Sequence, residues 1–236
     1  MQIEDNIFYV TEIFESIQGE GNYAGVNSLF IRFHFCNLTC IWCDTKYTWL
    51  EKSGNFKKYS ALELKQIITE SKPYHIIFTG GEPTFYRLDH LFTEGKKFHV
   101  ETNGSINPVN SLQLILNDGT KIKRDPMDAG TISLFNWVVS PKLSNSRQNL
   151  NEECIKYWSI QEFCIFKFII KSEFDLDEVE TVMNILNIKK QKVYIGLEGI
   201  TLQSQLRPEL VDKIMQRGFN FSPRLHTMLW GAAKGK

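Results

Sequence analysis

Three of the chain's five cysteines, Cys36, Cys40 and Cys43, lie within eight residues in the spacing CxxxCxxC. Thiolates are soft ligands, and they select iron–sulfur clusters, zinc or copper(I). A [4Fe–4S] cluster that only transfers electrons usually has four cysteine ligands. A local set of three leaves one iron free to bind a substrate or cofactor, so the spacing favours a reactive cluster.

Two other interpretations of these cysteines remain open. Zinc could be held by the three thiolates together with His34 or a distant histidine, and a disulfide with a spare thiol also satisfies the count. However, CxxxCxxC is not a common paired zinc spacing, and no second CxxC follows downstream. Cys154 and Cys164 stand apart, and Cys164 lies in an apolar strand pattern that predicts a buried thiol.

Residues 28–35 lead into the cysteine loop and alternate with a period of two. Leu29, Ile31, Phe33 and Phe35 share one face, and the other face carries Phe30, Arg32 and His34. A planar guanidinium is the side chain best suited to a bidentate grip on a carboxylate. Arg32 is therefore either a substrate clamp or an edge-strand arginine that reaches solvent, and His34 is expected to pack beside it.

The elements that would position these residues read as a series of strands, several of them ending in a polar or glycine motif. The expected strands are 7–14, 28–35, 74–79, 98–100, 137–139, 163–170 and 193–197, and the expected helices are 61–71, 175–188 and 207–217. The C-terminal rim of parallel strands is where barrel proteins build their sites. Only 18 residues separate Glu82 from Glu101, which leaves room for barely one helix. We therefore predict an α/β fold: an open, partial TIM-type barrel of about six parallel strands with trimmed helices.

The domain prediction is one unit over residues 1–236, with an irregular segment at 105–135. Residues 46–59 form a modest insert after the cysteine loop. Its Trp49 and its Lys57–Lys58 pair could form a docking face for an electron donor, and we favour a plain solvated loop.

Composition limits the class of partner. Lysine plus arginine and aspartate plus glutamate both number 27, so the formal net charge is zero and no global field attracts nucleic acid or an acidic membrane. No signal-peptide pattern and no apolar run long enough for a membrane helix is present. Clustered cysteines fit a reducing compartment better than a disulfide framework, and we expect a cytoplasmic protein that handles a small molecule.

A family resemblance emerges from the motifs taken together. The cysteine loop, with Trp42 before its last cysteine, and the later segment Thr79-Gly80-Gly81-Glu82-Pro83 resemble the cluster loop and the GGEP motif of radical S-adenosylmethionine (SAM) enzymes. Further segments are similar to those of the 7-carboxy-7-deazaguanine synthases of the queuosine and 7-deazapurine pathway: 16–21, 30–33, 43–45, 101–104, 140–142, 223–226 and 229–231. The resemblance runs from about residue 11 to the C-terminus and is weakest at 105–135.

The resemblance implies a carbon–nitrogen lyase that converts 6-carboxy-5,6,7,8-tetrahydropterin to 7-carboxy-7-deazaguanine with loss of ammonia. It implies a [4Fe–4S] cluster, SAM that is cleaved to a radical and regenerated, and Mg²⁺. It also implies a homodimer, and a reductase or flavodoxin is the expected electron donor.

The resemblance also assigns residues. The cluster ligands are Cys36, Cys40 and Cys43, and the Mg²⁺ ligand is Thr45. The residues for SAM are Trp42, Cys43, Asp44, Gly81, Ser140, Pro141 and Lys142, and those for the substrate are Ile17, Gln18, Gly19, Arg32, Thr79 and the chain end at Lys236. Weaker candidates are Glu101 and Asn103 for the ribose, Glu198 for SAM and His226 near the substrate; Glu198 lies in a strand end, 196–199, that lacks the proline often found there.

Two rival functions follow from the same sequence. Another small radical SAM enzyme, such as a glycyl-radical activase, would share the cysteine loop and a trimmed barrel. A non-enzymatic zinc-binding module would use the same thiols without SAM.

Overall fold

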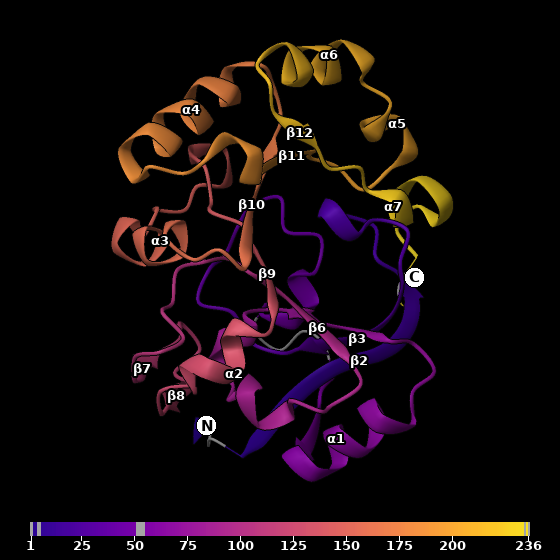
Figure 1. The fold of residues 1–236 in the computed structure, drawn as a ribbon, viewed down its shortest axis with the longest axis vertical. Helices are drawn as coiled ribbons and strands as arrows, with labels where there is room; N and C mark the ends of the chain where they lie inside the picture. The colour runs from indigo at the N-terminus through magenta and orange to yellow at the C-terminus, as the bar shows by residue number, and fades with distance from the viewer. Residues whose placement is uncertain (1, 4–5, 51–54, 234, 236) are drawn as a thin grey trace.

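The computed structural model describes residues 2–3, 6–50, 55–233 and 235, and its centre is a nine-stranded sheet that curls into part of a barrel (Figure 1). In spatial order the strands are β12 (Asn220–Phe221), β11 (Val193–Leu197), β10 (Cys164–Ile170), β9 (Asn136–Val139), β6 (Lys97–Thr102), β5 (His75–Gly80), β3 (Asn27–Phe33), β2 (Ile7–Ile17) and β4 (Lys57–Ser60).

The run from β12 to β3 is parallel throughout, whereas β2 and β4 add an antiparallel edge. This confirms the predicted partial TIM-type barrel, with seven parallel strands in place of about six. Among the parallel strands, the one that the sequence did not predict is β12, because a strand of two residues is too short to show a period.

Side-chain alternation gives the parallel strands two different faces. The outward residues are apolar and inaccessible to solvent, such as Ile31, Phe78 and Val100. On the other face, Arg32 of β3 lies opposite Thr79 of β5, so polar groups line up across neighbouring strands inside the curl. Because side chains alternate along each strand, the same strands form the core and supply the site.

Helices pack on the outside of the sheet (Figure 1). The predicted helix at 61–71 is present and starts with the expected capping box between Ser60 and Glu63. The α-helices are α1 (Ala61–Glu70), α2 (Ala129–Ser133), α3 (Glu152–Ser159), α4 (Phe174–Leu186), α5 (Leu202–Gln205), α6 (Pro208–Gln216) and α7 (Leu225–Trp230). Short 3-10 turns are η1 (Gly21–Tyr23), η2 (Lys46–Thr48), η3 (Pro83–Phe85), η4 (Leu88–Leu91), η5 (Ser144–Ser146) and η6 (Lys190–Lys192).

The prediction that residues 105–135 are irregular was wrong. The segment contains a hairpin of β7 (Leu112–Ile115) and β8 (Lys121–Arg124), extended by β1 (Gln2–Ile3), and then α2. Buried Arg124 holds it in place by donating to carbonyl oxygens that include those of Thr84 and Pro108. These long-range contacts, which stabilise two four-residue strands, leave no periodic signal in the sequence.

The insert at 46–59 is also more than a solvated loop. Its described residues include η2 and β4, and the latter forms one edge of the main sheet. Trp49 turns inward toward the cysteine loop, where its indole N–H lies 3.2 Å from the Cys43 Sγ.

The barrel is open because its end strands β12 and β4 do not pair with each other in the described chain. The gap is bridged by the turn after β2 and the segment after β12. The Gly21 amide donates to the Ser222 Oγ at 2.8 Å, and the Leu225 amide donates to the Gly19 carbonyl at 3.0 Å. Within the described residues, no helix combines the length and the apolar character needed to cross a membrane.

Two histidines lie at the N-terminal end of the strands, below the site. The His75 Nδ1 and the His99 Nε2 are 2.8 Å apart, and the Tyr23 ring packs on His99 with centroids 4.4 Å apart. Burial lowers the pKa of His99 from 6.5 to about 3. His99 is therefore a neutral core residue in the folded chain.

This burial predicts a pH dependence of stability. The pKa of His99 in the folded chain lies below its unfolded value of 6.5. Neutral His99 therefore contributes fully to the free energy of unfolding above pH 6.5, and this contribution is lost as the pH falls. Between about pH 7.5 and 5.5, the free energy of unfolding should decrease by about 1.4 kcal/mol through His99. Denaturant titrations should show that His99→Gln loses less stability over this range than the parent chain. Equal losses in the two proteins would contradict the assignment.

Candidate active site

A cavity of about 230 Å³ inside the barrel brings together almost all the residues predicted from the sequence. Lining it are Ile17, Gln18, Gly19, Arg32, Cys36, Cys40, Trp42, Cys43, Asp44, Thr45, Thr79, Gly81, Ser140 and Lys142, and the four weaker candidates Glu101, Asn103, Glu198 and His226. Pro141 is buried and does not line the cavity. Lys236 lies outside the described residues, and Gly235 comes close to Phe14.

The three cysteines of the loop are free thiols on one part of the cavity wall. In the described chain, no three side chains of the His, Cys, Asp and Glu types are grouped so that they could hold a metal ion as they stand. Burial raises the pKa of Cys36 and of Cys40, so their thiolates need a positive partner. Trp49 donates to the Cys43 sulfur, and the Leu38 amide donates to the Cys36 Sγ at 3.4 Å. This donor set fits a multi-iron cluster.

The Thr79–Pro83 motif connects the strand ends beneath the cysteine loop. A Cβ added at Gly81 would overlap with the Phe35 carbonyl, so only glycine lets the loop before Cys36 lie against this strand end. Glu82 is fully buried, and burial raises its pKa. Its carboxyl group accepts from the Thr84 and Thr102 hydroxyls, both at 2.7 Å, and from the Asn103 amide at 2.8 Å. Glu82 therefore fixes Asn103 rather than facing the cavity.

The Ser140–Lys142 motif forms the wall next to the cysteines. The Lys142 Nζ donates to the Ser140 Oγ at 2.9 Å and lies 5.5 Å from the Trp42 ring centroid. The Trp42 indole in turn donates to the Asn145 Oδ1 at 3.0 Å. Trp42 and Lys142, which were predicted from separate motifs, are thus in contact. The Ser140 hydroxyl and the Lys142 ammonium group lie beside the cysteine loop.

The part of the cavity lined by β3, β5 and β6 carries polar groups that can accept or donate further hydrogen bonds. Glu101 accepts from the Gln18 Nε2 at 3.0 Å on one oxygen and from the Thr79 Oγ1 at 2.8 Å on the other. Arg32 donates from its Nε to Glu12 at 2.8 Å. Its Nη nitrogens form no hydrogen bond with the described residues.

Aromatic rings flank this polar wall. The guanidinium carbon of Arg32 lies 5.6 Å from the Phe14 ring centroid, and Phe14 stacks on Phe30 with centroids 5.0 Å apart. Both phenylalanines line the cavity. A flat molecule with a carboxylate would match this combination of ring faces and a guanidinium.

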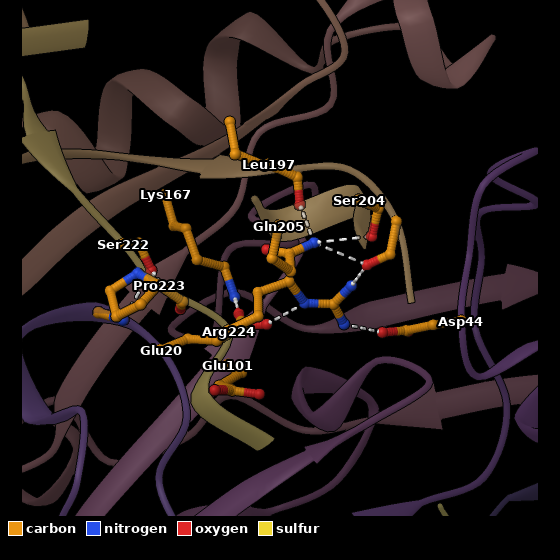
Figure 2. A network of polar contacts seen from close by, with 12 residues as sticks. Glu20, Asp44, Glu101, Lys167, Leu197, Ser204, Gln205, Ser222, Pro223 and Arg224 are labelled. Atoms are coloured by element: carbon orange, nitrogen blue, oxygen red, sulfur yellow. Dashed lines mark hydrogen bonds and ion pairs between the residues drawn. The ribbon is translucent and has the colours of Figure 1, made fainter. Parts of the chain in front are cut away.

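An ion network at the open side of the barrel was not predicted (Figure 2). The carboxylate of Glu20 is paired with Lys167 on one oxygen and with the Arg224 Nε on the other, at 2.8 Å in the latter case. Burial alone would raise the pKa of Glu20, but the charges of Lys167 and Arg224 hold it well below its usual range. Arg224 also pairs with Asp44.

The sequence did contain a signal for part of this network. Lys167 interrupts the apolar run Cys164-Ile-Phe-Lys-Phe-Ile-Ile of a central strand, where a lysine must be buried and paired. Glu20 and Arg224 lie in the segments 16–21 and 223–226, and the family resemblance assigned no role to either residue. Trp49 was missed because nothing local places the insert against Cys43.

The comparisons with known proteins agree with this geometry. Residues 30–119 match the family described as the radical SAM superfamily. The chain is 40% identical to a 7-carboxy-7-deazaguanine synthase of Buchnera aphidicola over 93% of this chain and 97% of that protein. It is 31% identical to one of Thermoplasma acidophilum over 96% of this chain and 99% of that protein.

A solved structure shares the fold. The crystal structure of QueE from Escherichia coli superposes with a TM-score of 0.69, covering 93% of this chain and 95% of that one at 21% identity. The identities over nearly full lengths, together with a cysteine loop and strand-end motifs that face one cavity, show that this chain belongs to the 7-carboxy-7-deazaguanine synthase family of radical SAM enzymes.

Proposed function

We propose that this chain converts 6-carboxy-5,6,7,8-tetrahydropterin to 7-carboxy-7-deazaguanine with loss of ammonia, and so acts as a carbon–nitrogen lyase. The observation that carries the proposal is that the cysteine loop and the groups suited to a carboxylated pterin line the same cavity. Ammonia is the only other product, so the conversion balances without an external oxidant.

The cofactors would occupy the side of the cavity formed by the cysteine loop. Cys36, Cys40 and Cys43 would hold a [4Fe–4S] cluster. SAM would lie along Trp42, Cys43, Asp44, Gly81, Ser140 and Lys142, with buried Pro141 fixing the backbone between the last two. When bound, the cluster and SAM supply the radical chemistry that starts the reaction.

The substrate would occupy the side formed by β3, β5 and β6. The 2-amino group and N3–H of a pterin are adjacent in-plane donors, and one carboxylate can accept both. Glu101 is that carboxylate in our proposal, because Gln18 and Thr79 already orient it. The Nη nitrogens of Arg32 would bind the substrate carboxylate, and Phe14 would cover the ring face.

Several further features belong to the proposal. Thr45 lines the cavity, and the hydrogen-bond partner of its hydroxyl in the described chain is the Cys43 thiol at 3.6 Å. This hydroxyl would supply a hard oxygen ligand to Mg²⁺. We also propose one radical SAM domain over the whole chain, a homodimer, a reductase or flavodoxin as electron donor, and a reducing cytoplasm that keeps the cysteines free.

The proposal is tested by anaerobic purification, metal analysis and turnover. We expect about four irons and four sulfides per chain, an electron paramagnetic resonance (EPR) signal of the reduced protein that changes on adding SAM, and ammonia release from the tetrahydropterin. Zinc in place of iron would favour the metal-binding module. A SAM-responsive cluster without turnover of the pterin would favour another radical SAM enzyme.

Replacing Arg32 tests the substrate clamp. Arg32→Ala removes a charge-assisted bond to the carboxylate, so KM for the pterin should rise about 10- to 100-fold. Iron content and the response of the EPR signal to SAM should not change. Arg32→Lys should recover only part of the loss, because it lacks the bidentate fork. Unchanged KM in Arg32→Ala would refute this role.

Replacing Glu101 distinguishes two roles for that residue. Glu101→Gln keeps the shape and removes the charge that a pterin amidine edge would meet, so KM for the pterin should rise about 10-fold or more. If the dissociation constant of SAM rises instead and KM for the pterin is unchanged, Glu101 contacts the SAM ribose. Both values come from the same reconstituted protein.

A further inference from the structure

Arg224 bonds three segments that are far apart in the sequence (Figure 2). Its Nε donates to the Glu20 Oε1 at 2.8 Å, and its Nη1 donates to the Gly199 carbonyl at 2.6 Å. Its Nη2 pairs with the Asp44 Oδ2. The three acceptors belong to the turn after β2, the loop after β11 and the cysteine loop, and the arginine itself follows β12.

The turn at residues 17–21 and the cysteine loop at residues 36–45 are connected through Arg224 rather than directly. In the described chain, no hydrogen bond or ion pair directly joins residues 17–21, which carry the proposed substrate contacts, to residues 36–45, which carry the cluster and SAM contacts. Arg224 bonds to both through Glu20 and Asp44. Its side chain is only 10% exposed, so these bonds are largely shielded from water.

We infer that Arg224 is a positioning residue that couples SAM binding at the cysteine loop to pterin binding at residues 17–20. The inference rests on the proposed function. Asp44 is in the SAM wall and directly precedes Thr45, whereas Glu20 directly follows Gln18 and Gly19. One planar guanidinium thus sets the relative position of the two half-sites.

The coupling follows from rigidity. A guanidinium presents its donors in a fixed fork, so its acceptors cannot shift independently while all the bonds are kept. A ligand that orders the cysteine loop therefore also restricts the turn at Glu20, and the second ligand meets a turn that is already ordered. The effect must be reciprocal: each ligand should tighten the other by the same factor.

The surroundings allow Arg224 to be replaced without stranding a buried charge. Glu20 keeps its pair with Lys167 when the arginine is changed. The side chain of Asp44 is 38% exposed and can be solvated. Arg224→Lys retains the positive charge but cannot hold all three acceptors at once, so it removes the fork and leaves the net charge of the site unaltered.

Binding titrations of the anaerobically reconstituted protein test the coupling. The dissociation constant of SAM is measured with and without 6-carboxytetrahydropterin, and the ratio of the two is the coupling factor. We expect a ratio of about five or more in the parent chain and a ratio near one in Arg224→Lys. Arg217→Lys, which alters a surface ion pair with Asp177 on the outside of the barrel, is the matched control and should keep the parent ratio.

Hydrogen–deuterium exchange of the same reconstituted protein gives a second readout that needs no turnover. Glu20→Gln does not touch the cysteine loop, yet it should speed exchange at residues 40–45 because it weakens the hold of Arg224. Arg224→Lys should speed exchange at both 17–21 and 40–45, and Arg217→Lys at neither.

The outcomes separate the two proposals. A parent ratio of one, or equal ratios in the parent chain and Arg224→Lys, overturns the coupling and leaves the proposed function standing. Exchange at 40–45 that is unaffected in Glu20→Gln also overturns it. A parent chain that binds SAM but no pterin overturns the proposed function, and the coupling with it.

Discussion

The ion pairs of Glu20 are the interaction on which the site depends. A carboxylate that is largely shielded from water must be paired, and here Lys167 of β10 and Arg224 after β12 both pair with Glu20. An open barrel has no backbone ladder between its end strands. Charged side chains, with two backbone donations from Gly21 and Leu225, take over that role. Glu20, Lys167 and Arg224 close the gap and also line the cavity, so the same side chains close the barrel and shape the site.

The strands themselves serve two purposes through simple alternation. Their outward residues, such as Phe78 and Val100, bury apolar surface against the surrounding elements. Their inward residues, such as Thr79 and Glu101, can be polar because they bond to one another between neighbouring strands. A rigid apolar core thereby holds the inward polar side chains in fixed positions, and catalysis requires such fixed orientation.

The Thr79–Pro83 motif shows how a signature can be largely structural. Gly81 allows the segment at Phe35 to approach, and Glu82 collects donors from Thr84, Thr102 and Asn103. The motif therefore connects the ends of β3, β5 and β6. Glu82 of this motif is a buried hydrogen-bond acceptor that joins the strand ends, whereas Glu101 lines the cavity.

Much of the fold and site follows from the sequence because the determining signals are local. The spacing of Cys36, Cys40 and Cys43 predicts a metal loop, the alternation around Arg32 places the arginine on the polar face, and Ser60 with Glu63 marks the start of a helix. The tertiary structure alone decided which strand ends meet, and with them the partners of Glu20, the indole of Trp49 at Cys43 and the hairpin held by Arg124. Each of these depends on contacts between residues far apart in the chain, such as Glu20 and Arg224, 204 positions apart. A charge in the sequence shows that a partner is needed once it is buried, but only the folded barrel determines which residue that partner is.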